Sequence, residues 1–256
     1  MFHKIAFITL MFYAEFVCCY IFHVRNRTVD KLALYNDADY FDWRDKDAVS
    51  PVKDQGSCAA CWAFSIIANI ESQMKIYNNV ELVLSEQFLI DCLKSSSGCE
   101  EGSVLKSLSD IVSDFGGVLT EADYYPYEQA KRTCRWNGRK NPMIPVVGYR
   151  RVKANEDVMA RFVRKGTLIA GINSKSMDKY TGGIDEPGDD CDPNKKDHSV
   201  LIVGYGTYVS DDQKVPYWII KNSWGTSWGD KGFYYLVRGR NACGIATDVS
   251  YAIVGN

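Results

Sequence analysis

The chain has 256 residues, of which 46% are hydrophobic and 24% charged, so it encodes a globular protein with a sizeable core rather than a disordered chain. Its formal net charge of -2 argues against a nucleic-acid partner, because such proteins usually carry a basic face. The length suits one or two domains, and no repeat or run of charge stands out.

Residues 1–24 are typical of a secretory signal peptide. A basic start precedes the apolar run Ile5–Ala14, and a second apolar stretch follows Glu15. An uncleaved anchor is the alternative, but an acidic residue near its middle disfavours a spanning helix. The secretory route predicts a lysosome-like compartment or the extracellular space, with no stable membrane partner. Asn26 begins a glycosylation sequon, which is relevant only if that segment is kept.

Three helices are predicted in the first half of the chain. Cys61–Asn78 has apolar residues at helical spacing on one face. Ser85 is a typical N-cap for a short helix that runs to Cys92. A third helix is expected over Ser103–Phe115, where Gly116 and Gly117 end the pattern.

After about Pro145 the residue pattern changes from one typical of helices to one typical of strands. The segments VVGYRRV, LIAGI, SVLIVGYG, YWIIK and GFYYLVR are β-branched and aromatic, with glycine and proline between them. One helix, Asn155–Arg164, interrupts them. The pattern therefore predicts two packed lobes of different type, and the cleft between two lobes is a common place for a substrate.

Cysteine and histidine counts single out one candidate pair for catalysis. Removal of Cys18 and Cys19 with the signal leaves seven cysteines, an odd number that predicts three disulfides and one free thiol. His198 is the only histidine outside the first 24 residues. Cys61 opens the long predicted helix, whose N-terminus favours a thiolate, so Cys61 and His198 are expected to meet across the lobes.

Four segments in order resemble the papain and cathepsin L-like family of cysteine proteases. QGSCAACWAFS resembles the family's nucleophile segment, DHSVLIVGYG its histidine segment, YWIIKNSWGTSWGDKGFYYLVRG its asparagine segment and CGIATDVSYAIV its C-terminal end. FDWRDKDAVSPVKDQG, SEQFLIDC and GCEEG match further framework segments. The resemblance implies an α+β fold with a helical left lobe, a β-barrel-like right lobe and an active-site cleft between them.

The resemblance also implies roles for individual residues. Cys61 would be the nucleophile of a cysteine endopeptidase and His198 its acid and base. Asn222 would orient the imidazole, under cover of Trp224, and core packing is the alternative reading for this tryptophan. Gln55 would donate its side-chain amide to the oxyanion together with the backbone N–H of Cys61.

The implied substrate contacts and disulfides follow the same matches. Gly102 would pair with the substrate backbone, while Val104 and Ala170 would be apolar walls of the P2 pocket. Asp248, five positions after Cys243, would lie at the floor of that pocket and accept basic P2 residues, unless it turns to solvent or pairs with Lys196. The implied disulfides are Cys58–Cys99, Cys92–Cys134 and Cys191–Cys243.

The expected organisation is a short pro-segment remnant at 25–38 and a peptidase domain at 39–256, with a helical lobe at about 48–146 and a β lobe at about 147–250. Two departures from the family pattern are notable. Ala59 and Ala60 replace the usual Gly-Ser between two cysteines, and GCEEG replaces GCNGG. The pro-segment is also far shorter than the family's helical one, so we expect poor refolding of the chain alone.

Other readings of the same residues remain open at this stage. Cys58-Ala-Ala-Cys61 is a CxxC and would suit a redox protein, unless Cys58 pairs with Cys99. A zinc site is weaker, since the chain has no second CxxC or histidine pair. An inactive homologue acting as a binding module is the other alternative. For the protease we expect a monomer without metal or cofactor, with protein or peptide substrates and cystatin-like inhibitors as partners.

Overall fold

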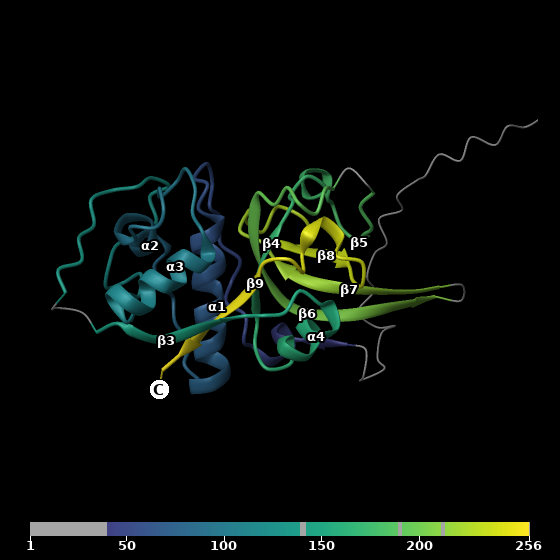
Figure 1. The fold of residues 1–256 in the computed structure, drawn as a ribbon, viewed down its shortest axis with the longest axis horizontal. Helices are drawn as coiled ribbons and strands as arrows, with labels where there is room; N and C mark the ends of the chain where they lie inside the picture. Colours follow the sequence, from purple (N-terminus) through teal and green to yellow (C-terminus); the bar gives the residue numbers. More distant parts are fainter. Residues whose placement is uncertain (1–39, 139–141, 189–190, 211–212, 256) are drawn as a thin grey trace, which may run out of the picture.

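The computed structural model describes residues 40–138, 142–188, 191–210 and 213–255. The expected signal peptide, the segment 25–38 and Asn26 therefore lie outside the described residues. Within them, α2 and α3 lie on one side of the molecule and most of a mixed sheet, with α4 beside β6, lies on the other, and α1 and β9 run between the two (Figure 1). This is the α+β class that the sequence predicts.

The helical side forms where the sequence pattern predicts helices. Ser85 caps the second helix, because its hydroxyl accepts a 3.0 Å hydrogen bond from the backbone N–H of Phe88. The third helix passes into a π-helical turn and ends at Gly116, whose φ of 74° is left-handed. The helices are α1 (Cys61–Asn78), α2 (Glu86–Cys92), α3 (Val104–Asp110), the π-helical turn η2 (Ile111–Phe115) and α4 (Glu156–Val163), which is capped by Asn155.

The strands form one sheet in the order β2-β3-β9-β4-β6-β7-β8-β5, with β1 added beside β6. Neighbours are antiparallel except for the parallel pair β5 and β8. The strands are β1 (Phe41–Asp42), β2 (Gly117–Val118), β3 (Ile144–Arg151), β4 (Leu168–Ile172), β5 (Ile184–Asp185), β6 (His198–Ser210), β7 (Gln213–Lys221), β8 (Phe233–Val237) and β9 (Val249–Val254), and short 3-10 turns lie at Trp43–Lys46, Met177–Lys179 and Ala242–Gly244.

The sheet register determines which residues come together. In the β6–β7 hairpin Leu201 lies opposite Lys221, so the start of β6 and the residues just after β7 meet at one end. His198 begins β6, and Asn222 follows β7. The hairpin therefore brings these two side chains together, although 23 residues separate them in the sequence, as the numbering shows.

Two strands connect the lobes. β3 pairs with β2 on the helical side and with β9 along the rest of its length. β9 in turn pairs with β4 and packs against α1. The expected lobe boundary at 146/147 therefore falls inside β3, because this strand is shared by both sides.

Helix α1 is buried on every side rather than on one face. All residues from Trp62 to Met74 are buried, including polar ones. Because the helix lies between α2 on one side and strands β6 and β9 on the other, it has no solvent face along this stretch. Asn69 illustrates how the polar residues are satisfied: its amide donates to Thr167 O at 2.8 Å and accepts from Ala252 N at 2.8 Å.

A cluster of buried charges, which we call the interlobe charge cluster, lies beside α1 and consists of Lys53, Glu71, Glu86 and Lys221. Lys53 Nζ lies 3.1 Å from Glu71 and 2.7 Å from Glu86. Lys221 Nζ donates to Ser50 Oγ at 3.0 Å, and that hydroxyl donates to Glu71. Glu71 and Glu86 lie on helices, whereas Lys221 ends β7, so the cluster joins the two lobes.

Burial shifts two of these groups toward their neutral forms. Burial raises the pKa of Glu86 to about 7, against the opposing attraction of Lys53. Burial lowers the pKa of Lys221 to about 8, against the opposing attraction of Glu71. Near neutral pH both groups are therefore close to their titration points.

The Glu86 carboxyl should make the folded protein more stable in mild acid. Its pKa is about 7 in the folded chain against a reference value of 4.5, so between these pH values the folded state holds a proton that the unfolded state lacks. This contribution to stability grows as pH falls from about 7 to about 4.5, by at most about 3 kcal/mol. Urea unfolding at pH 7.5 and pH 5, in a Cys61→Ser background that prevents autolysis, measures it.

In Glu86→Gln we expect this gain to be lost, so the free energy of unfolding changes less between the two pH values than in the parent. Glu81→Gln, which removes an exposed carboxyl, is the matched control and should keep the parent's pH dependence. An unchanged pH dependence in Glu86→Gln would show that this carboxyl is already ionised at pH 5.

Candidate active site

Cys61 is the first residue of α1 and the only cysteine without a disulfide among the described residues. Its side chain is partly exposed. The next residue, Trp62, is almost fully buried and donates from its indole to Gly98 O at 3.2 Å. Cys61 is thus held in place at a helix N-terminus, where the partial positive charge favours a thiolate.

Asn222 fixes the orientation of His198. The imidazole Nε2 donates to Asn222 Oδ1 at 2.7 Å, which leaves Nδ1 as the acceptor. Both residues are buried, and the ring of Trp224 lies 4.9 Å from the imidazole. Trp228 supports Trp224 edge-on at 5.0 Å. Trp224 therefore packs against the imidazole, and Trp228 packs against Trp224.

Electrostatics favour neutral forms for Cys61 and His198 when each is considered alone. Burial raises the pKa of the Cys61 thiol, while backbone N–H groups of Ser199 and Trp62 lower it. Burial lowers the pKa of His198, while the Asn222 hydrogen bond and the Asp197 carboxylate raise it. The contact of Cys61 with Ser199 N–H places the thiol beside the histidine strand. A thiolate and an imidazolium formed together would attract each other, which offsets the cost of burial.

Gln55 is held by hydrogen bonds at both ends of its side-chain amide. Its Oε1 accepts from the hydroxyl of Ser223 at 2.6 Å, and its Nε2 donates to Cys58 O at 2.9 Å. The backbone of Gln55 also donates to Ser223 O at 2.8 Å. Nε2 carries two hydrogens, so one donor remains after the bond to Cys58.

A cavity of about 490 Å³ lies between the lobes and includes both Cys61 and His198 in its wall. Gly102 and Val104 line it, as the sequence predicts. A side chain at Gly102 would come within 2.4 Å of the Trp62 ring, so this position requires glycine. The wall is formed by Ala59, Cys61, Trp62, Glu100, Glu101, Gly102, Ser103, Val104, Leu105, Ile169, Gly171, Lys196, Asp197, His198, Ser199, Asp248, Val249 and Ser250.

The wall contributed by β4 differs from the sequence prediction. Ala170 is completely buried and does not line the cavity, whereas its neighbours Ile169 and Gly171 do. Successive side chains of a strand point to opposite faces, so a shift by one residue exchanges the two sides. The expectation that Ala170 is a wall of the pocket is therefore corrected to Ile169 and Gly171.

Asp248 lines the cavity but faces two cations. Its carboxylate lies 3.3 Å from Lys196 Nζ and 3.4 Å from Arg151 Nη2. The side chain of Asp248 is 49% exposed and that of Lys196 19%. This is the pairing with Lys196 that the sequence left open, and Arg151 adds a second positive charge that the sequence did not indicate.

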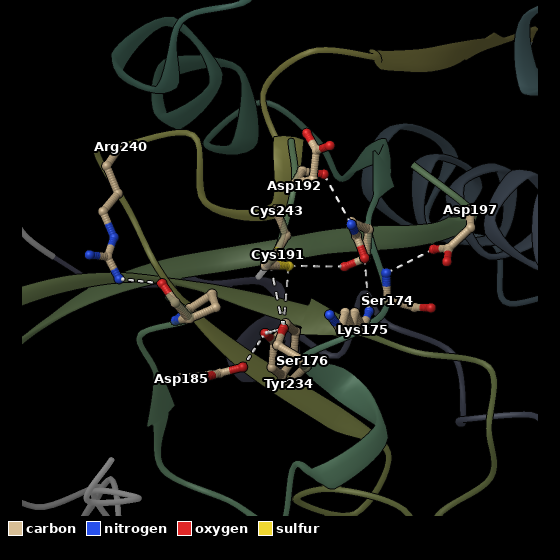
Figure 2. The surroundings of a disulfide bond; sticks show 12 residues. Ser174, Lys175, Ser176, Asp185, Cys191, Asp192, Asp197, Tyr234, Arg240 and Cys243 are labelled. Atoms are coloured by element: carbon tan, nitrogen blue, oxygen red, sulfur yellow. Dashed lines mark hydrogen bonds between the residues drawn. A yellow bond between two sulfur atoms is a disulfide. The ribbon is translucent and has the colours of Figure 1, made fainter. Parts of the chain in front are cut away.

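The described cysteines pair as the family resemblance implies. Disulfides join Cys58–Cys99, Cys92–Cys134 and Cys191–Cys243. Because Cys58 is bonded to Cys99, the CxxC motif cannot alternate between dithiol and disulfide within itself, and the redox reading loses its support. Figure 2 shows the surroundings of the Cys191–Cys243 disulfide, which extend through Ser174 to Asp197; Asp197 precedes His198 and accepts a 2.8 Å hydrogen bond from Ser174 N.

Two residues of the site, Ser223 and Ser199, were missed by the sequence analysis. Ser223 orients Gln55, and its only signal was its place beside Asn222. Ser199 follows His198 and shares a 2.7 Å hydrogen bond with Ser65 of α1, which ties β6 to the helix one turn below Cys61. Their contacts join segments far apart in the chain, which a local pattern does not reveal.

Neither a metal centre nor a membrane span is found in the part of the chain that the structure describes. No three histidine, cysteine, aspartate or glutamate side chains there form a group able to hold a metal ion. None of its helices has the length and apolar character needed to cross a bilayer.

Comparison with known sequences supports the resemblance over almost the whole described chain. The model of the papain family of cysteine proteases matches residues 38–253. Cathepsin F of Drosophila melanogaster is 40% identical over 219 residues, which cover 84% of this chain and 35% of that protein. Cysteine proteinase 1 of Dictyostelium discoideum is 39% identical, covering 84% and 65%. The chain thus spans between about one third and two thirds of the length of these curated relatives.

Solved structures show the same fold. Bromelain from Ananas comosus, solved in complex with the inhibitor E64, superposes with a TM-score of 0.74 at 36% identity, covering 85% of this chain and 99% of that one. Procathepsin L2 from Tenebrio molitor gives a TM-score of 0.77 at 36% identity, covering 88% and 70%.

The pairing pattern predicts one reactive thiol between residues 58 and 243. When the native protein is alkylated with iodoacetamide, then reduced and labelled with a second reagent, only Cys61 should carry the first label. Peptide mapping by mass spectrometry measures this. Cys61→Ser should leave no first label in this range, and a first label on Cys58 or Cys99 would contradict their pairing.

Proposed function

This chain belongs to the papain family of cysteine proteases, and we propose that it cleaves peptide bonds through a covalent acyl-enzyme formed on Cys61, with His198 as acid and base. One observation carries the proposal. The single unpaired thiol of the described residues lies at a helix N-terminus and shares a cavity wall with a histidine that is oriented by Asn222. These are the nucleophile, the base and the orienting group that acyl transfer requires.

In the first half of the reaction, Cys61 forms the acyl-enzyme. Nδ1 of His198 takes the thiol proton, and the sulfur attacks the carbonyl carbon of the substrate, whose π electrons move to the oxygen. The remaining Nε2 hydrogen of Gln55 and the backbone N–H of Cys61 would stabilise this oxyanion; the latter, at the first helical position, has no partner within the helix. When the carbonyl re-forms, the C–N bond breaks and His198 protonates the leaving amine.

In the second half, water hydrolyses the thioester. His198 removes a proton from water, and the resulting oxygen nucleophile attacks the same carbonyl carbon. The oxyanion forms in the same place and collapses with cleavage of the C–S bond. The thiolate regains its proton from the imidazolium, and the acid product leaves.

The cavity wall indicates how a peptide would lie. Gly102 has no side chain and its backbone borders the cavity, so it can pair with the backbone of an extended peptide. Val104, Ile169 and Gly171 offer an apolar wall for one side chain. Substrates would therefore be unfolded segments or flexible loops of proteins, and cystatin-like inhibitors would occupy the same cleft of a monomeric enzyme.

A secretory location fits the cysteine chemistry. Three disulfides in the described residues are typical of an oxidising compartment. The increase in stability expected from Glu86 in mild acid also suits a lysosome-like compartment, although the extracellular space fits the disulfides equally well.

The alternative reading, an inactive homologue acting as a binding module, requires that a group needed for catalysis be missing or misplaced. Cys61 is free, His198 and Asn222 are bonded to each other, and the Gln55 amide is fixed. No observation favours the alternative.

The central test is labelling and activity of the nucleophile. An epoxysuccinyl peptide should alkylate Cys61 and stop hydrolysis of a fluorogenic peptide with one-to-one stoichiometry. Cys61→Ser should lose hydrolysis entirely, and Asn222→Ala should lower kcat/KM by about 10-fold or more, because the histidine would lose its orientation. Hydrolysis that persists in Cys61→Ser would contradict the mechanism.

The charges around Asp248 change what the sequence predicted for the P2 pocket. Lys196 and Arg151 together outweigh the single carboxylate, so the immediate surroundings of Asp248 are net positive, whereas Glu100, Glu101 and Asp197 add negative charge elsewhere in the cavity wall. A basic P2 side chain would have to compete with both cations for Asp248. We therefore infer that Lys196 limits the acceptance of basic P2 residues. Asp248 favours a basic P2 side chain only where Lys196 is removed.

Lys196→Gln should raise the ratio of kcat/KM for P2 arginine over P2 leucine by about 3- to 10-fold, since a partly exposed ion pair is worth only about 1 kcal/mol. The measurement uses paired fluorogenic peptides that differ only at P2. Adding Asp248→Ala to Lys196→Gln should return the ratio toward the wild-type value.

Lys195→Gln is the matched control, because it neutralises the neighbouring lysine, which bonds to Asp192 and does not line the cavity. A ratio of P2 arginine to P2 leucine that is the same in Lys196→Gln and wild type would mean that the charge of Lys196 does not affect selectivity at P2.

A further inference from the structure

The segment that carries Gln55 is a turn closed by several hydrogen bonds. Within it, Cys58 N donates to Gln55 O at 3.3 Å, Gln55 Nε2 donates to Cys58 O at 2.9 Å, and Gly56 N donates to Asp54 Oδ1 at 2.8 Å. Its corner residues, Gly56 and Ser57, are exposed, and Gly56 has a left-handed φ of 55°. Ser223 holds Gln55 from the β side, through the amide and through the backbone. On the helical side, the Cys58–Cys99 disulfide and a 3.0 Å hydrogen bond from Ala59 N to Cys99 O fix the end of the turn but do not reach its corner.

Tyr127 and Gln129 hold the beginning and the corner of the turn from the helical side. The Tyr127 hydroxyl donates to Gln55 O at 2.7 Å, and its ring lies edge-on against Phe64 of α1 at 5.0 Å. Gln129 Oε1 accepts from Ser57 N at 3.1 Å and from Ser57 Oγ at 3.4 Å. The two side chains therefore bind consecutive parts of the same turn.

The loop that carries Tyr127 and Gln129 is itself fixed to α2. Gln87 is completely buried, and its side-chain amide forms hydrogen bonds with Glu128 and Ala130, the residues before and after Gln129. Gln87 Oε1 accepts from Glu128 N at 2.9 Å, and Gln87 Nε2 donates to Ala130 O at 2.8 Å. A rigid helix thus determines where Tyr127 and Gln129 lie.

The backbone at Gln129 shows that this arrangement is specific. Gln129 has a φ of 54°, a left-handed conformation that costs a side-chain-bearing residue roughly 1–2 kcal/mol. A Cβ added to Gly56 would come within 2.1 Å of Gln129 Oε1, so the amide lies directly against the turn. The strained residue and the glycine fit each other closely.

We propose that Tyr127 and Gln129 are positioning residues that hold the Gln55 turn, so that the Gln55 amide is aligned for the oxyanion before substrate binds. The inference rests on the proposed function, because it assigns these residues a part in the same reaction. A hydrogen-bond donor stabilises an oxyanion only when it is placed within a few tenths of an ångström, and loss of such a donor costs about 100- to 1,000-fold in kcat. Partial misplacement should cost a fraction of that.

Tyr127→Phe removes the hydroxyl and keeps the ring against Phe64. We expect kcat for peptide hydrolysis to fall about 5- to 20-fold while KM changes less than about threefold, because the bond acts on the transition state. Alkylation of Cys61 by an epoxysuccinyl peptide should stay within about twofold of wild type, since opening an epoxide forms no carbonyl oxyanion. A purely structural defect would lower both rates together.

Gln129→Gly separates positioning from stability. Glycine adopts the left-handed φ without strain, so the variant should be at least as stable as wild type in urea unfolding. It should nevertheless lose about 2- to 5-fold in kcat, because the bonds to Ser57 are gone. Tyr125→Phe is the matched control: its hydroxyl bonds to Asp91 rather than to the turn, so kcat should not change.

A double-mutant cycle decides whether the effect passes through Gln55. In a Gln55→Ala background, Tyr127→Phe and Gln129→Gly should have no further effect on kcat, because the amide that they position is absent. Equal losses in both backgrounds, an equal loss in Tyr125→Phe, or alkylation that falls in step with hydrolysis would overturn the inference alone. A wild-type protein that neither hydrolyses peptides nor is alkylated at Cys61 would overturn the proposed function as well.

Discussion

The burial of α1 between the lobes is the constraint on which the rest of the structure depends. The helix packs against α2 on one side and against β6 and β9 on the other, so both lobes are built around it. Its N-terminus ends at the cavity, which places Cys61 where the lobes meet. The histidine strand is tied to the same helix through Ser65 and Ser199, so nucleophile and base share one rigid support.

Burial on all sides requires that the polar residues of α1 find partners. Glu71 does so in the interlobe charge cluster, where Lys53 and Ser50 reach it from the segment that leads to Gln55. The cluster lies beside the candidate site, because Lys221 immediately precedes Asn222 in the chain. Charges that join the lobes and groups that would perform the reaction are thus neighbours.

The cleft combines residues of very different solvent exposure. His198, Asn222 and Gln55 are buried and bonded at fixed distances, which suits groups that must be aligned before the substrate arrives. Asp248 and the two glutamates of the GCEEG segment are exposed or half-exposed side chains at the same cavity. Chemistry would depend on the first set, whereas selectivity would depend on the second, whose charges are screened by solvent and easily changed by substitution.

The sequence by itself determined the elements and the candidates for the reactive groups. The helix at Cys61–Asn78, the Ser85 cap and the helix from Asn155 follow from local periodicity and capping, which act between residues three or four apart. The odd cysteine and the single histidine after the signal region left Cys61 and His198 as the candidate pair, and four ordered motifs added Asn222 and Gln55 by resemblance.

Only the tertiary structure decided which groups touch. It buried α1 on every face, turned Ala170 away from the cavity, paired Asp248 with Lys196 and Arg151, and brought Tyr127 and Gln129 to the Gln55 turn. Such contacts depend on the register of strands and on the docking of loops from distant parts of the chain. A one-residue shift of register exchanges the faces of a strand without changing its local pattern, so no local signal in the sequence could have fixed them.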